Sequence, residues 1–125
     1  MTAAEIVSTM YENDAFSQWL GIERLEQRPG YSRLRMTVRK EMTNGFAIAH
    51  GGITYSLADS ALAFASNGHG VQSMSIETSI SHTRAVKAGD QITAEVEEVN
   101  LTRRTGIYNI RITNQEGQLV ALFKG

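Results

Sequence analysis

The hydrophobic positions along the chain follow two different spacings. Residues 51–66 are apolar or small at nearly every position, and a helix without a polar face is normally buried on all sides. Residues 31–38 instead alternate, with Leu34, Met36 and Val38 separated by polar side chains, which predicts a strand. Among the first twenty residues the apolar positions are spread as in one or two short helices.

The rest of the chain is predicted to form strands and turns. An extended segment is expected over residues 22–26, a turn at Pro29-Gly30, and a loop over residues 39–49. Further strands are predicted for residues 71–83, 92–101, 107–112 and 119–123, with turns at residues 88–90 and 114–117. Short links between strands favour an antiparallel sheet. We therefore expect a single α+β domain over residues 1–125, in which the sheet curls around one long helix.

Composition excludes several classes of protein. The 125 residues carry a net charge of −1, which argues against nucleic acid or a membrane surface as a partner. No stretch is apolar for the roughly 20 residues of a membrane span, and the N-terminus has no secretion-signal pattern. The absence of cysteine rules out disulfides and thiolate zinc sites. A cytoplasmic protein is expected.

One acidic residue interrupts the apolar helix. Asp59 follows a helix start at His50-Gly51-Gly52, and carboxylates are almost never fully buried without a partner. The placement favours chemistry, although a structural network or a gap to solvent would also explain an acid there.

Asn44-Gly45, His50-Gly51-Gly52 and Asp59 together resemble the hotdog-fold acyl-CoA thioesterases. The segments at residues 10–15, 57–61, 88–90, 105–108 and 120–125 are similar to the phenylacetyl-CoA thioesterase branch of that family. This resemblance covers nearly the whole chain. It implies a long central helix wrapped by a curved antiparallel sheet, hydrolysis of phenylacetyl-CoA or a related aromatic acyl-CoA, no cofactor, and assembly into dimers and then tetramers.

The resemblance also assigns roles to individual residues. It gives the Gly51 N–H the task of binding the thioester carbonyl, which suits the unpaired amides of a helix start. Asp59 matches the catalytic acid, acting as nucleophile or as general base. Asn44, His50 and Gly52 are candidates for shaping the substrate loop. Ser75, expected on the strand after the helix, matches a position that carries a serine which helps to place water in some relatives. An ordinary strand hydroxyl is the interpretation that the sequence favours for it.

The spacing of two of these residues has a geometric consequence. Gly51 and Asp59 are eight residues apart, or about 12 Å along a helix. Both groups cannot reach one carbonyl carbon from the same chain. If both act on one thioester, the site combines Gly51 of one subunit with Asp59 of another.

Coenzyme A carries phosphates, so basic residues are expected along its path. The candidates are Arg84, Lys87, Arg103 and Arg104. His69 and His82 are expected to be structural or exposed, and no His or acid pair has metal-ligand spacing, so no metal is predicted.

Two other functions remain open. One is a hotdog hydratase or dehydratase, although the helix lacks the histidine those enzymes generally use. The other is a non-catalytic acyl-CoA-binding domain. The chain also departs from the family near His82, where relatives often have an aromatic or bulky apolar residue, and at Ala85, where they have proline. Both changes bear on the acyl group.

Overall fold

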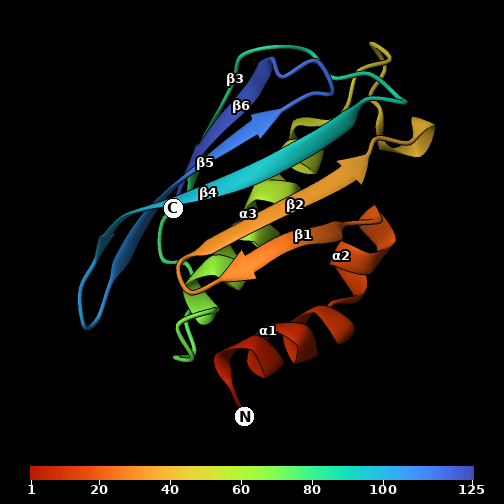
Figure 1. The fold of residues 1–125 in the computed structure, drawn as a ribbon. Helices are drawn as coiled ribbons and strands as arrows, with labels where there is room; N and C mark the ends of the chain where they lie inside the picture. The colour runs from red at the N-terminus through yellow and green to blue at the C-terminus, as the bar shows by residue number, and fades with distance from the viewer.

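A curved six-stranded antiparallel sheet wraps one face of a long helix in the computed structural model, which describes all 125 residues (Figure 1). The sheet order is β1-β2-β4-β5-β6-β3. The helices are α1 (Ala3–Glu12), α2 (Ala15–Leu20) and α3 (Gly51–Asn67). The strands are β1 (Glu23–Arg28), β2 (Tyr31–Thr37), β3 (Ser79–His82), β4 (Gln91–Leu101), β5 (Gly106–Thr113) and β6 (Leu119–Lys124). The predicted order of two strands, one long helix and four strands is confirmed.

Local sequence explains the first half of the fold. Asp14 caps α2 by accepting a hydrogen bond from the Ser17 N–H at 3.0 Å, and Gly21 ends that helix with a φ of 75°. Gly30, with a φ of 74°, closes the predicted turn between β1 and β2. In the predicted loop, residues Lys40–Met42 form a single turn of 3₁₀ helix.

The core lies between α3 and the concave face of the sheet. In β2 the predicted alternation holds, since Leu34 and Met36 are fully buried and the intervening residues are not. Leu57 and Phe64 of α3 and Phe123 of β6 are also buried and belong to the same hydrophobic core. The sheet thus covers the apolar side of the helix.

The expectation that α3 is buried on all sides is wrong for the single chain. Gly51, Gly52 and Asp59 are exposed, while Ser56 and Ala63 are only partly covered. The sheet curves around one side of α3, and α1 and α2 cover only part of the other (Figure 1). Most residues on this exposed side are small rather than charged, so the sequence did not indicate that the side is exposed.

The predicted strand over residues 71–83 is mostly absent. Only Ser79–His82 pair with a neighbouring strand, β6, and residues 71–78 have no regular structure. Met74 and Ile76 in this segment are 84% and 91% exposed. Backbone without an adjacent strand cannot form ladder hydrogen bonds, so alternation alone did not produce a strand here.

Candidate functional site

The start of α3 presents backbone donors that have no partner in the chain. His50 is the residue before the first helical turn, with an extended conformation and no side-chain capping bond. The Ile53 N–H donates to the His50 carbonyl at 2.9 Å, whereas the Gly51 and Gly52 N–H groups have no acceptor. Such free amides lie at the positive end of the helix dipole and suit an oxygen that becomes negative during a reaction.

Asn44 shapes the loop that leads into this helix. Its Oδ1 accepts hydrogen bonds from the Phe46 N–H at 2.9 Å and the Ile48 N–H at 3.4 Å. Its N–H donates to the Ile48 carbonyl at 2.8 Å. The turn includes Ala47 at a φ of 61°, the one non-glycine residue with positive φ. Asn44 therefore holds a tight turn against the helix start.

A cavity of about 440 Å³ opens beside the helix start. Its wall includes Asn44, Gly51 and Arg84, three of the residues singled out in the sequence, together with Thr54 and His82. His50, Gly52 and Lys87 are exposed near this region but do not line the cavity. His82 was expected to be structural or exposed; it is exposed, yet it lies in the wall next to Gly51.

Asp59 lies two turns further along α3, on its exposed side. Its carboxylate makes no hydrogen bond or ion pair within the chain. Surrounding protein nevertheless removes enough water to raise the pKa of the Asp59 carboxyl, and the negative charge of Asp14 raises that pKa further. The sequence predicted a buried acid; the structure has an accessible acid whose charged form is disfavoured.

A chain of hydroxyl contacts links α2 to α3 beside this acid. Asp14 Oδ2 accepts a hydrogen bond from Ser17 Oγ at 2.6 Å, and Ser17 Oγ lies 2.7 Å from Ser60 Oγ. Ser17 is 1% exposed, and Ser60 directly follows Asp59. Sequence reasoning missed this contact, because nothing in the spacing of residues 14–20 indicates what α2 packs against.

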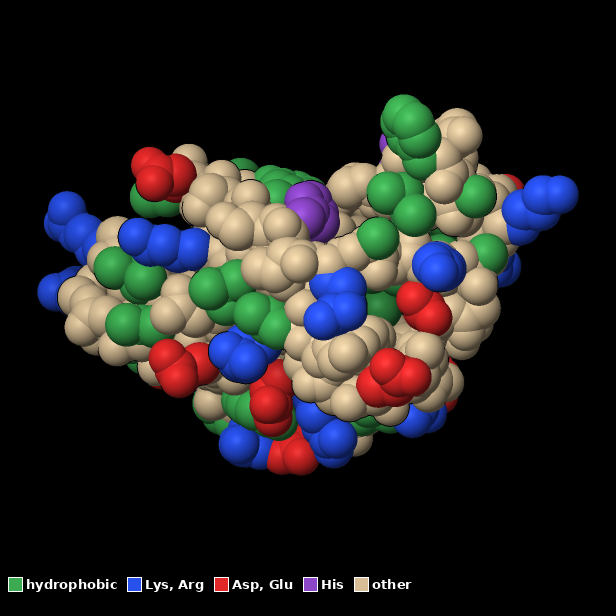
Figure 2. Space-filling view, turned by 90° about the horizontal axis from the view of Figure 1, so that it is seen from above, with side chains coloured by type: hydrophobic (Ala, Val, Ile, Leu, Met, Phe, Trp, Pro, Cys, Tyr) green, Lys and Arg blue, Asp and Glu red, His purple; other side chains and the backbone are tan.

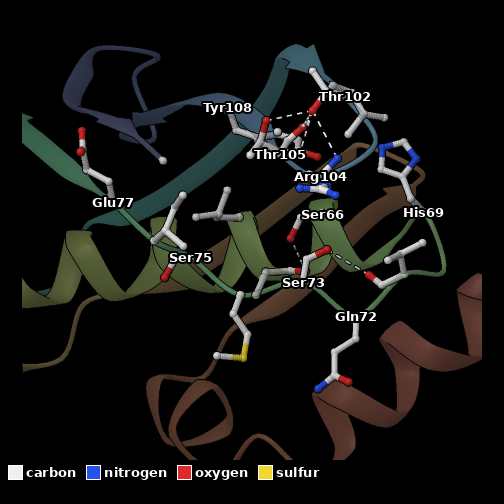
Figure 3. A pocket seen from close by; sticks show the side chains of 18 of the residues that line it. Ser66, His69, Gln72, Ser73, Ser75, Glu77, Thr102, Arg104, Thr105 and Tyr108 are labelled. Carbon is white, nitrogen blue, oxygen red and sulfur yellow. Dashed lines mark hydrogen bonds between the residues drawn. The ribbon is translucent and has the colours of Figure 1, made fainter.

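Asp59 lines a second cavity, of about 690 Å³. Figure 3 shows this cavity, with Ser75 and Arg104 among its labelled lining residues. Ser75, Arg103 and Arg104 also line it, the first from the segment after α3 and the two arginines from the β4–β5 loop. Ser75 does not lie on a strand, contrary to expectation, because residues 71–78 are irregular. It is nevertheless in the same wall as Asp59.

A polar cluster stands at the far end of this cavity. His69 Nε2 lies 2.6 Å from Glu98 Oε2, and the Tyr108 hydroxyl donates to the same oxygen at 2.9 Å. Burial alone would raise the pKa of Glu98, but the hydrogen bonds from His69 and Tyr108 outweigh it and lower that pKa. Burial and the bond to Glu98 raise the pKa of Tyr108. His69, expected to be structural or exposed, is a structural partner of Glu98.

The two cavities share no residue. Gly51 lines one and Asp59 lines the other, in agreement with the separation of about 12 Å expected along a helix. One chain thus carries the free amide and the free carboxylate in two separate cavities.

The basic residues proposed for coenzyme A are free of ion pairs within the chain. Arg84, Lys87, Arg103 and Arg104 are exposed, and none lies within salt-bridge distance of an acid. Figure 2 shows charges of both signs scattered over one face, without a large patch of either. No group of three His, Asp or Glu side chains is arranged to hold a metal ion. No helix is long and apolar enough to cross a membrane.

Comparison with known proteins identifies the family. A family model described as the thioesterase superfamily matches residues 46–121, which include Gly51 and Asp59 of α3. The chain belongs to the thioesterase superfamily. Its fold is the hotdog thioesterase fold, and its class of activity is thioester hydrolysis.

Relatives of this thioesterase cover nearly all of its chain. The acyl-coenzyme A thioesterase PaaI of Escherichia coli is 40% identical over 93% of this chain and 83% of its own length. The structure of the E. coli PaaI protein from the phenylacetic acid degradation operon matches 98% of this chain and 89% of that one, with 39% identity and a TM-score of 0.96. The crystal structure of a hypothetical thioesterase protein with coenzyme A, from Streptococcus pneumoniae, matches 93% of this chain and 91% of that one at 28% identity and a TM-score of 0.87.

Proposed function

We propose that this thioesterase hydrolyses acyl-CoA thioesters in a site shared between two subunits. The observation that carries the proposal is the placement of the free Gly51 amide and the free Asp59 carboxylate in two separate cavities of one chain. We call these two cavities the half-sites of the shared site. The one lined by Gly51 supplies an oxyanion donor and the one lined by Asp59 supplies an acid, the two groups that thioester hydrolysis needs.

The chemistry follows from the two half-sites. The thioester carbonyl oxygen accepts a hydrogen bond from the Gly51 N–H. One such donor typically raises kcat by a factor of roughly 10²–10³. As a nucleophile, Asp59 attacks the carbonyl carbon, the C–S bond breaks to release the coenzyme A thiolate, and water hydrolyses the resulting mixed anhydride. As a general base, Asp59 instead takes a proton from the attacking water, and the C–S bond breaks as the thiolate leaves and is protonated. The proposed role of Ser75 is to orient that water, and its support is that Ser75 lines the same cavity as Asp59. Asn44 and His50 hold the loop that presents Gly51.

A second copy of the chain is the proposed source of the missing half. Val71, Met74, Ile76 and Leu101 line the Asp59 cavity and are more than half exposed, and contiguous exposed apolar side chains mark interaction surfaces. We propose a dimer, and a tetramer formed from two dimers. The cytoplasm is the proposed compartment, in line with a chain that contains no cysteine.

Free arginines in both cavities support coenzyme A as the leaving group. Arg84 lines the Gly51 cavity, and Arg103 and Arg104 line the Asp59 cavity. Guanidinium groups without an internal partner are available to bind phosphates. Lys87 lines neither cavity, so we expect its replacement to raise KM less than replacement of an arginine.

Phenylacetyl-CoA or a related aromatic acyl-CoA is the proposed substrate. The support is similarity to PaaI of the phenylacetic acid degradation operon over nearly the whole chain. Small side chains on α3 could leave room for a ring, but of its four alanines Ala58, Ala61 and Ala65 are fully buried in the core and only Ala63 lines a cavity. The alanines therefore give little independent support.

Release of free coenzyme A, detected with a thiol reagent, tests the activity. We expect higher kcat/KM for phenylacetyl-CoA than for hexanoyl-CoA or palmitoyl-CoA. A preference for palmitoyl-CoA would contradict the aromatic substrate and leave the thioesterase assignment intact. Binding of acyl-CoA with no release from any thioester would instead support a non-catalytic acyl-CoA-binding domain.

Complementation between two inactive variants tests the shared site. Asp59→Ala removes the acid, and Gly51→Pro removes the amide hydrogen at the first helical position, where the backbone tolerates proline. The proline Cβ would lie 3.1 Å from His82 Cε1, a contact that an alanine at this position shares. The extended His50, with φ −55° and ψ 143°, is compatible with a following proline. Co-expression should restore activity through mixed dimers in which one site is intact.

Gly51→Ala is the matched control for the proline variant, because it adds a Cβ at the same position but keeps the N–H. Gel filtration should show that both parent variants still form dimers. Mixed dimers that are folded and inactive would mean that one chain supplies both groups, and the shared site would be abandoned.

A further inference from the structure

His82 connects the edge of the sheet to the first turn of α3. Its Nε2 lies 2.6 Å from Thr54 Oγ1, and Thr54 Oγ1 donates to the Gly51 carbonyl at 3.0 Å. The imidazole also covers Gly51 directly, since a Cβ built on that glycine would lie 3.1 Å from His82 Cε1. The space left by the missing side chain is thus filled by this ring.

The number of available protons determines which nitrogen of the His82 ring donates to Thr54. The Thr54 hydroxyl has one proton, and the Gly51 carbonyl can only accept. Both contacts are satisfied together only if Thr54 donates to Gly51 and His82 donates Nε2–H to Thr54. His82 Nδ1 has no partner within the chain, so in the neutral ring the proton lies on Nε2 and Nδ1 is bare.

This arrangement acts on a flexible part of the backbone. Two consecutive glycines begin α3, and glycine restricts the backbone less than any other residue. Thr54 is 2% exposed, so its hydroxyl is held in the protein and cannot exchange its partners freely for water. The hydrogen bond from Thr54 to the Gly51 carbonyl restrains the peptide group that joins Gly51 to Gly52. The His82 ring packs against the Gly51 Cα. Together these two contacts restrain the backbone on the C-terminal side of the Gly51 N–H.

We propose that His82 is a positioning residue for the oxyanion donor: through Thr54 and by direct packing it holds the Gly51 backbone in the orientation that binds the thioester carbonyl. This inference rests on the proposed function, in which the Gly51 N–H is that donor. His82 acts through Gly51. A group that orients a transition-state donor affects kcat more than KM.

Four substitutions separate the hydrogen bond from the bulk of the side chains. His82→Phe keeps a ring over Gly51 but removes the donor, whereas His82→Gln keeps an N–H donor at a similar reach. Thr54→Val removes the hydroxyl at nearly constant volume, whereas Thr54→Ser keeps it. We expect His82→Phe and Thr54→Val each to lower kcat by roughly two- to tenfold, the effect of one neutral hydrogen bond. KM should change little, and Gln and Ser should retain most of the rate.

The double variant gives a readout that a purely structural role would not move. If His82 acts through Thr54, the combined His82→Phe and Thr54→Val variant should be no slower than the slower single variant. Urea unfolding of each variant shows whether lost rate merely follows lost stability. Independent losses in kcat, or a His82→Phe variant with the wild-type kcat, would overturn the proposal.

¹⁵N NMR of the histidine side chains tests the contact without any activity. The His82 signals, assigned by their absence in His82→Phe, should show a protonated Nε2 and a bare Nδ1, and they should shift in Thr54→Val. A neutral His82 ring with its proton on Nδ1 and a bare Nε2 would overturn the proposal. Wild-type protein that releases no coenzyme A from any thioester would instead refute the proposed function, while the NMR result would still decide whether His82 holds Gly51 through Thr54.

Discussion

Replacement of Asp59 by asparagine should separate the activity of this thioesterase from its stability. Asp59 makes no hydrogen bond within the chain, so the isosteric asparagine loses no contact and the fold should survive. The variant loses only the negative charge. A general base contributes about 10²–10⁴ in rate, so kcat/KM should fall by that factor, which corresponds to about 2.7–5.4 kcal/mol in the barrier.

Stability should change in the opposite direction. Burial and the charge of Asp14 raise the pKa of Asp59 in the folded protein, so the folded state disfavours its carboxylate. Above the folded pKa the ionised acid destabilises the fold, and Asp59→Asn should be more stable than wild type. As the pH falls through the folded pKa toward the ordinary value, the folded carboxyl is protonated and the advantage of the variant is lost.

Two measurements check this prediction. Thiol-reagent detection of coenzyme A gives kcat/KM, and urea unfolding at neutral and acidic pH gives the difference in stability. Glu77→Gln is the control, because Glu77 lines the same cavity as Asp59 and has no role in the mechanism. An asparagine variant that retains more than about a tenth of the wild-type rate, a barrier change under roughly 1.4 kcal/mol, would refute the role of Asp59. Equal stability at both pH values would refute the electrostatic reasoning.

Two further predictions concern the neighbours of the half-sites. Asp14→Asn keeps the cap of α2, since asparagine caps as well as aspartate, but removes a negative charge that raises the pKa of Asp59. The acid limb of the pH–rate profile should therefore move to lower pH. An unchanged acid limb would contradict the coupling between Asp14 and Asp59. Gly30→Ala should destabilise the protein more than Gly117→Ala in urea unfolding. Both glycines have positive φ, but a Cβ on Gly30 would lie 2.8 Å from Glu98 Cδ, whereas nothing lies within 4 Å at Gly117. When Glu98 is also replaced by alanine, Gly30→Ala should destabilise the protein no more than Gly117→Ala. Each substitution should then lower the free energy of unfolding by only the backbone cost of about 1–2 kcal/mol.

Local sequence predicted the strand, turn and helix whose hydrophobic spacing or backbone preference can be recognised within a few neighbouring residues. The alternation of Leu34 and Met36 predicted β2 because each strand residue faces either the core or the solvent. Pro29-Gly30 predicted the hairpin turn, since the second residue has the positive φ that glycine allows. The run of small and apolar residues predicted α3 from residue 51 onward, and the structure begins that helix at Gly51.

The same reasoning failed where the outcome depended on which segment lies alongside. Residues 71–78 alternate like a strand, but no strand lies beside them. Asp59 was expected to be buried because its helix lacks a polar face, yet the sheet covers only one side of α3 and leaves the acid exposed. Hydrophobic pattern records how apolar a surface is, and the chain topology decides whether anything covers it.

The sequence by itself determined the fold class, the helix start at Gly51-Gly52, and the separation of Gly51 from Asp59, because each depends on spacing along one helix or strand. Tertiary structure alone decided that Gly51 and Asp59 line different cavities, that Asp14 bears on the pKa of Asp59, and that His82 covers Gly51. These contacts join residues 28 to 45 positions apart. Nothing in the local backbone preferences of either partner encodes such an interaction, which arises only when the sheet and α2 pack against α3.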